Sequence, residues 1–198
     1  LFDGENLILD GSIKHGNVKI PETDITATHV KARAKVSDGV LSIAKATGKI
    51  NKSNILSGFL DIDLINYKDS PFSGEFFIDL DLTETPQILI SLLPGTMLSD
   101  ELAKVSQVDG SASLKLSLNK PTNKDLEVFV KTEDFSVSGL YERIPDRILL
   151  DHVKFEYRPD IISLTDVTGT INKNNLKKVN LKVSFENKII IENMTGQA

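Results

Sequence analysis

Residues 111–118 read SASLKLSL, and residues 74–82 read GEFFIDLDL. In both stretches apolar side chains recur at every second position, with polar or charged side chains between most of them. Successive side chains of a strand point to opposite faces of a sheet, so this period is typical of half-buried antiparallel strands. The two stretches therefore predict a mainly β fold.

The same alternation recurs along the chain. It is clear in residues 58–64 (GFLDIDL), and weaker in residues 126–131, 148–157, 161–167 and 179–185. Turn signals such as Asp38-Gly39 separate the runs. Short strands at this spacing favour a sandwich, a barrel or a long meander.

One segment departs from the strand pattern. Residues 85–94 (TPQILISLLP) predict a short helix with Thr85 as its N-cap and Pro86 in its first turn. Residues 99–106 (SDELAKVS) predict a second short helix capped by Ser99. We therefore expect a helical insert near residues 86–106, between two strands of one sheet.

The chain contains an internal repeat. Residues 41–64 align without gaps on residues 162–185, and the matches include Thr47-Gly48 with Thr168-Gly169 and Ile50-Asn51-Lys52 with Ile171-Asn172-Lys173. Units that recur in this way usually stack to extend a sheet. We expect residues 1–198 to form a single β-rich module. The start at Leu1 and the strand-like run at the end suggest a segment of a larger protein.

Composition limits the classes of function. The 198 residues carry a net charge of −5, which disfavours binding to nucleic acid. Aromatic residues make up 6% and Trp is absent, so a stacking platform for bases or sugars is not expected. The absence of Cys excludes disulfides, thiol nucleophiles and Cys-based zinc sites. No stretch of sequence is long and apolar enough to span a bilayer.

No arrangement of residues predicts an active site, a metal or a cofactor. His15, His29 and His152 lack metal-ligand spacing, and His29 and His152 fall in predicted strands. The sharpest constellation of carboxylates is Asp61, Asp63, Asp79 and Asp81. It is compatible with calcium or with a glycosidase acid/base pair. We favour a solvated sheet face relieved by Lys45, Lys115 or Lys131, and we expect no enzyme.

The apolar faces of the clearest strands are the remaining candidate. They consist of Leu60, Ile62, Leu64, Phe76, Ile78, Leu80, Leu114, Leu116 and Leu118. Alternation shows only that one face avoids water. These nine side chains therefore line either a closed core or an open groove for an apolar ligand.

Several stretches resemble the AsmA-like family of bacterial envelope proteins, of the TamB and YhdP type. Residues 10–21 (DGSIKHGNVKIP) are similar to the family's repeated G-x-I-x-x-G-x-V-x-I-P strands. Residues 37–60 are similar to another sequence unit of the family, which contains spaced glycine and aliphatic residues. Residues 85–114 resemble its P-x-L-x-x-L-L-P passage and the strand after it, and residues 146–169 resemble another unit.

The resemblance implies a long twisted antiparallel sheet, curved into a U-shaped groove or open barrel. It implies phospholipid, or another acyl-chain ligand, in a groove lined by the nine residues above, with the helical insert shielding Leu89, Leu92 and Leu93. It also implies a periplasmic location in a parent protein anchored in the inner membrane. The implied function is to shield or conduct phospholipid between the inner and outer membranes, which supports outer-membrane biogenesis. The alternative is a closed β-sandwich, a structural or interaction module without a lipid ligand.

Overall fold

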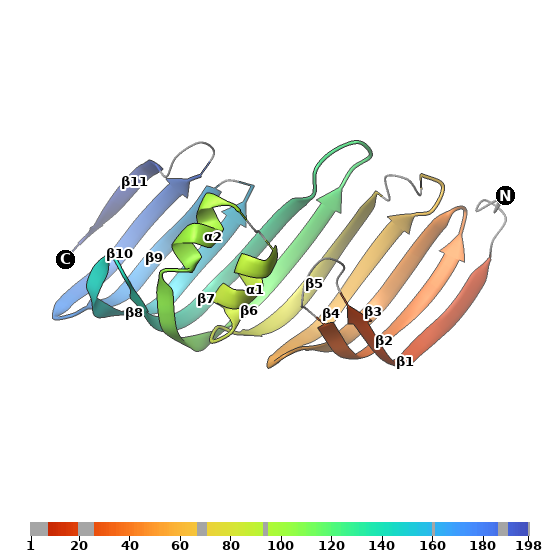
Figure 1. The fold of residues 1–198 in the computed structure, drawn as a ribbon, viewed down its shortest axis with the longest axis horizontal. Helices are drawn as coiled ribbons and strands as arrows, with labels where there is room; N and C mark the ends of the chain where they lie inside the picture. The colour runs from red at the N-terminus through yellow and green to blue at the C-terminus, as the bar shows by residue number, and fades with distance from the viewer. Residues whose placement is uncertain are drawn as a thin grey trace. The chain divides into compact units, whose positions relative to one another are not determined.

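A computed structural model describes residues 8–19, 26–66, 71–92, 95–159, 161–185 and 190–197. The fold is mainly β, as predicted, with eleven described strands in one antiparallel sheet (Figure 1). Each strand lies beside its neighbours in sequence, from β1 to β11, and the sheet is not closed. The strands are β1 (Leu9–Lys19), β2 (Thr26–Ser37), β3 (Val40–Ile50), β4 (Ser53–Asp63), β5 (Phe72–Asp81), β6 (Val105–Lys120), β7 (Glu127–Tyr141), β8 (Ile144–Arg158), β9 (Ile161–Ile171), β10 (Asn174–Ser184) and β11 (Ile190–Gln197).

Tight turns explain why consecutive strands are neighbours. The predicted turn at Asp38-Gly39 links β2 to β3, and both residues have positive φ, 53° and 72°. Asn51 and Asn172 begin the turns after β3 and β9 with φ of 52° and 57°. Asn, Asp and Gly tolerate this left-handed conformation, which fits the twist of a two-residue hairpin.

The chain divides into two compact units. The first unit comprises Leu1–Ile78 and Lys115–Phe129, and the second comprises Asp79–Leu114 and Val130–Ala198. The buried apolar side chains of the first unit are Ala32, Val36, Ala46 and Ile78, and those of the second are Leu82, Ala112, Val153 and Val167. A groove running through both units stays a prediction.

Polar residues with positive φ interrupt several strands. Lys45 in β3 and Asp166 in β9 have φ of 53° and 55°, and each precedes a buried residue, Ala46 or Val167. Positive φ also occurs at His29, Gln107, His152 and Lys178, each of which is followed by Val. A bulge of this kind bends the strand and shifts the inward side chains by one position. The histidines at 29 and 152 are thus exposed bulge residues within strands.

The two copies of the internal repeat fold alike. The first copy forms the β3–β4 hairpin and the second forms the β9–β10 hairpin, with four strands of 11 residues each. Lys45 of the first copy corresponds to Asp166 of the second, and both are bulge residues. Each copy therefore repeats a bent hairpin as well as a sequence.

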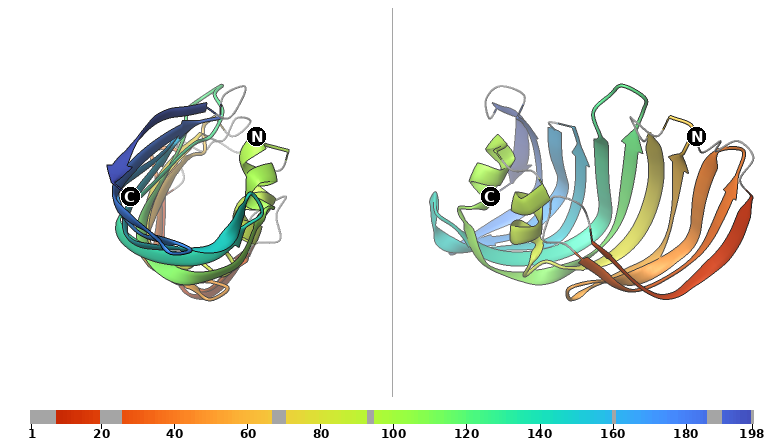
Figure 2. Two further views of the ribbon diagram at one scale, coloured as in Figure 1. Left: turned by 90° about the vertical axis from the view of Figure 1, so that its left-hand side faces the viewer. Right: turned by 45° about the vertical axis from the view of Figure 1, so that its right-hand side comes forward.

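The helical insert lies in the second unit, as helices α1 (Thr85–Leu92) and α2 (Met97–Leu102), beside the strands of that unit (Figure 2). The prediction that Ser99 caps the second helix is wrong. Thr96 is the N-cap, because its backbone is extended and its Oγ1 accepts a hydrogen bond from Ser99 N at 3.2 Å. Ser99 lies buried in the first turn, and Val105 and Ser106 already belong to β6.

Candidate functional site

The first unit carries an apolar face across three paired strands. Leu60 and Ile62 of β4 lie opposite Ile43 and Leu41 of β3. Those two residues lie opposite Ala34 and Val36 of β2. Directly opposed residues of an antiparallel pair share one face of the sheet. The predicted groove residues of β4 therefore continue an aliphatic face that reaches β2.

At two glycines, side chains of β4 and β5 pack closely on this same face. A Cβ at Gly58 would lie 2.2 Å from Cδ1 of Phe76, and a Cβ at Gly74 would lie 3.0 Å from Cδ1 of Leu60. Phe76 thus packs over Gly58, and Leu60 packs beside Gly74. The sequence predicted Phe76 and Leu60 as lining residues, and the structure brings them together on adjacent strands.

The other predicted residues are divided between the units. Leu64 follows the end of β4, Ile78 ends the first stretch of the first unit, and Leu116 and Leu118 lie on its part of β6. Leu80 and Leu114 belong to the second unit. The structure thus places seven of the nine predicted residues in one unit and two in the other.

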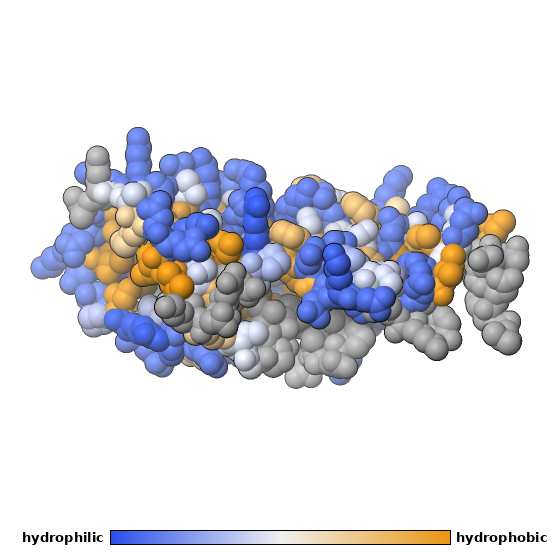
Figure 3. Space-filling model, turned by 90° about the horizontal axis from the view of Figure 1, so that it is seen from above, coloured by the Kyte–Doolittle hydropathy of each residue, from blue (hydrophilic) through white to orange (hydrophobic). Residues whose placement is uncertain are grey.

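The apolar face of the first unit is only partly covered. Of the seven predicted residues in this unit, Ile78 is buried and the other six are half-buried. The described residues of this unit include no helix to cover them. On the opposite face of β4, Phe59 is 44% exposed, so water reaches both faces of this strand to some degree. Apolar side chains reach the surface between polar ones in the space-filling view (Figure 3).

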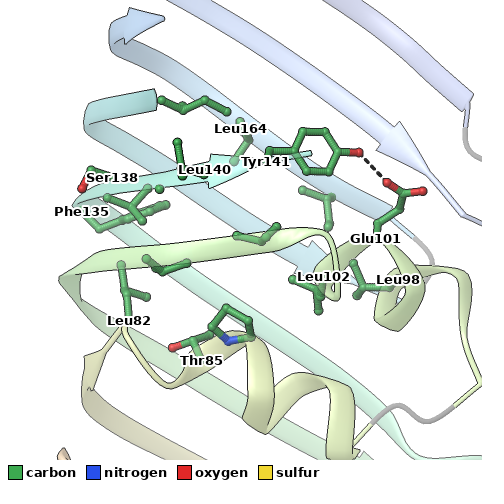
Figure 4. Close-up of a pocket in the computed structure, with 17 residues that line it drawn as sticks. Leu82, Thr85, Leu98, Glu101, Leu102, Phe135, Ser138, Leu140, Tyr141 and Leu164 are labelled. Atoms are coloured by element: carbon green, nitrogen blue, oxygen red, sulfur yellow. Dashed lines mark hydrogen bonds between the residues drawn. The ribbon is translucent and has the colours of Figure 1, made fainter. Parts of the chain in front are cut away.

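The second unit contains a cavity of about 480 Å³ between the helical insert and the sheet (Figure 4). Leu98 and Leu102 of α2 form one wall. The opposite wall comes from β7 and β9, through Phe135, Val137, Leu140, Ile162 and Leu164. Cavities of this size with apolar walls are typical of sites for small apolar ligands.

A polar cluster borders this cavity. Glu101, near the end of α2, accepts hydrogen bonds from Lys104 Nζ at 2.5 Å and from Arg143 at 2.6 Å. The Tyr141 hydroxyl, at the end of β7, also donates to the Glu101 carboxylate (Figure 4). Glu142 N donates to Lys104 O at 3.1 Å. These contacts fasten α2 to the turn between β7 and β8.

The cluster shifts the pKa of two of its members. The pKa of Glu101 is lowered to about 2, chiefly by the hydrogen bond from Lys104, then by that from Tyr141, with a smaller contribution from the charge of Arg143. Burial raises the pKa of Tyr141, and the hydrogen bond to Glu101 adds to the effect. Glu101 is therefore an anion at neutral pH, and its side chain is only 16% exposed.

Sequence reasoning missed most of this cavity. Pro86, Leu98 and Leu102 of the helical insert line it, and Leu89, which was expected to be shielded against the predicted groove, does not. Leu89 is half-buried, and the side chain of Leu92 and all of Leu93 lie outside the described residues. Residues 135–141 (FSVSGLY) hold an alternating signal that was available in the sequence. Neither segment alone predicted that α2 lies close to β7.

The four carboxylates of the predicted cluster are divided between the units, Asp61 and Asp63 in the first and Asp79 and Asp81 in the second. Asp63 accepts hydrogen bonds from the backbone and side chain of Asn66, Asp81 accepts from Thr83, and Asp79 accepts from Ser113 Oγ at 2.6 Å. Within the described residues no group of three His, Asp or Glu side chains is placed to hold a metal ion.

Two of the three lysines predicted to relieve these carboxylates, Lys115 and Lys131, form ion pairs with glutamates. Lys115 forms its ion pair with Glu75 at 2.7 Å, and Lys131 forms its ion pair with Glu133 at 2.6 Å. Both lysines thus neutralise nearby glutamates of the polar strand faces. The aspartates are instead stabilised by local hydrogen bonds, three of which come from turn residues or a neighbouring serine.

Comparison with protein-family models, with curated proteins and with solved structures gives no match for this chain. Neither described helix has the length and apolar character needed to cross a membrane.

Proposed function

We propose that this chain is a periplasmic segment of an AsmA-like envelope protein, in which an apolar sheet face shields or conducts phospholipid between the inner and outer membranes. The role is not enzymatic and supports outer-membrane biogenesis. The parent protein is anchored in the inner membrane through segments beyond this one. One observation carries the proposal: on the aliphatic face of β2, β3 and β4 in the first unit, Leu41, Ile43, Leu60 and Ile62 are half-buried, and the described residues of this unit include no helix.

The physical basis is the hydrophobic effect. Each CH₂ group of an acyl chain kept out of water contributes about 0.8 kcal/mol. The paired residues Leu41 with Ile62 and Ile43 with Leu60 offer a continuous aliphatic surface for such a chain. Large uncovered apolar surfaces are unusual on monomers and mark sites of interaction. No single residue needs to recognise the chain, so the continuity of the face carries the function.

A closed β-sandwich remains the alternative function. A sandwich needs a second sheet whose apolar face covers the first. All eleven strands of the described residues belong to one sheet. This observation favours the lipid-binding proposal over the sandwich.

Uptake of a pyrene-labelled phosphatidylethanolamine from vesicles tests the proposal. We expect the chain to extract the labelled lipid, and Ile62→Glu to reduce the extracted fraction several-fold, because a carboxylate on the apolar face must be desolvated. Phe59→Glu is the matched control on the same strand, since its side chain lies on the other face and is 44% exposed. The proposal fails if the folded chain extracts no lipid, or if both variants lose uptake equally.

A further inference from the structure

The cavity of the second unit combines apolar walls with charge at its border. Tyr141 and Glu101 both line the cavity, and Glu101 carries Lys104 and Arg143 on its carboxylate. The bonded cluster thus holds two cations and one carboxylate, which leaves one positive charge in excess.

The three hydroxyl groups in the wall already have partners, and that of Tyr141 is Glu101. Thr85 Oγ1 donates to Asp81 O at 3.2 Å, and Ser138 Oγ accepts from Arg147 at 2.8 Å. The remaining wall, which includes Leu102, Val137 and Leu164, is largely aliphatic or aromatic. The cavity therefore suits a hydrocarbon chain rather than a sugar or a nucleotide, whose hydroxyl groups need polar partners.

Arg143 is the more exposed of the two cations, and it is linked to the cavity wall through its hydrogen bond to Glu101. Its side chain is 60% exposed, whereas that of Lys104 is 29% exposed. A guanidinium has five N–H donors in a planar fork that matches carboxylate and phosphate oxygens. The contact with Glu101 uses NH2, and within the described part of the chain the side chain makes no second hydrogen bond. Lys104 and Tyr141 hold Glu101 even when an anion competes for Arg143.

We propose that this cavity binds an amphiphile with an acyl chain and an anionic head group. The chain lies between α2 and β7, and the carboxylate or phosphate of the head group binds Arg143. The inference rests on the acyl-chain function proposed above and adds the charge of the ligand and the place where its head group is held.

Binding of cis-parinaric acid, a fluorescent fatty acid, to the full chain tests the inference, with its methyl ester as the uncharged comparison. We expect the acid to bind about tenfold tighter than the ester, the scale of one charge-assisted hydrogen bond. Arg143→Gln removes that difference. Arg158→Gln is the matched control, because this arginine is on the same unit and 64% exposed, but belongs to an ion pair with Glu156.

A second variant tests the chain-binding wall. Gly139 lines the cavity, and a Cβ there would lie 3.4 Å from its nearest neighbour, Ser106 O, which is ordinary contact. Gly139→Leu therefore fills part of the cavity, and we expect it to weaken binding of acid and ester alike. Displacement of the acid by oleate or by oleoyl lysophosphatidate, whichever is stronger, identifies the preferred head group.

The outcomes separate this inference from the broader function. Equal affinity for acid and ester, unchanged by Arg143→Gln but weakened by Gly139→Leu, overturns the anionic head-group site and leaves acyl-chain binding in place. The inference is also overturned if neither oleate nor oleoyl lysophosphatidate displaces the acid. Failure of both the acid and the ester to bind the folded chain removes this site, and loss of vesicle uptake as well removes the proposed function.

Discussion

At the scale of single residues, backbone crowding marks where strands approach most closely. Gly169 of β9 has φ of +153°, and a Cβ there would lie 2.1 Å from Leu149 O. We expect Gly169→Ala to lower the free energy of unfolding by about 2 kcal/mol or more, because the strand must shift or strain. Urea unfolding followed by circular dichroism measures the change.

Gly139 supplies the control for this prediction. It lies on a strand of the same unit, but its nearest neighbour would be 3.4 Å from an added Cβ. Gly139→Ala should change the free energy of unfolding by less than about 0.5 kcal/mol. An equal loss of the free energy of unfolding in Gly169→Ala and Gly139→Ala would show that contact with Leu149 O does not cause the loss.

Bulge residues are the second feature at this scale. Lys45 has φ of 53°, a conformation that β-branched residues avoid. We expect Lys45→Val to lower the free energy of unfolding by about 1–2 kcal/mol. Lys49→Val on the same strand should leave the free energy of unfolding almost unchanged, since Lys49 is exposed and has ordinary strand geometry. Thermal or urea unfolding measures the free energy of unfolding of both variants. An equal loss in the two would argue against strain at the bulge.

At the scale of elements, the sequence predicted the strands well where no bulge interrupts them. Residues 58–64 and 111–118 alternate without a break. In β3, Leu41 and Ile43 face inward, but after the bulge at Lys45 the inward positions become Ala46, Gly48 and Ile50. A bulge shifts the period by one residue. This shift explains why residues 161–167 alternated less clearly, since Asp166 is a bulge residue.

Helix α2 depends on its polar cluster. A helix of six residues is not stable alone, so contacts with the sheet must hold it. The unfolded chain protonates Glu101 near its ordinary pKa of 4.5, whereas the folded chain keeps it ionised to about 2. Between these values the unfolded chain binds more protons, so acidification lowers the free energy of unfolding.

The pH dependence of Glu101→Gln tests this role. At neutral pH we expect the variant to be less stable than the parent chain, because its side chain is uncharged beside Lys104 and Arg143. The difference should shrink as pH falls from about 4.5 to about 2, where the parent loses the charge as well. Urea unfolding across this range measures it. A difference independent of pH would show that the ionised carboxylate does not hold α2.

At the scale of the whole molecule, alternation and turn residues predicted a mainly β fold with a helical insert, and the open sheet was implied by the family resemblance. The cavity was not predicted, because it forms between Leu102 of α2 and residues of β7 and β9 that are distant in sequence. Alternation assigns a side chain to a face, but it does not say what covers that face. The nine predicted groove residues were chosen by alternation alone, and their contact with lipid stays a prediction.

The most direct test of the central claim is photo-crosslinking to lipid in cells that express the full-length parent protein. A photoreactive residue at Leu60 probes the aliphatic face shared with Ile43, and one at Phe59 probes the opposite face of the same strand. Because both native residues are apolar, the pair separates the role of the face from hydrophobicity in general. We predict lipid captured at Leu60 and little at Phe59. Capture at neither position, or equally at both, in a folded protein would contradict the account.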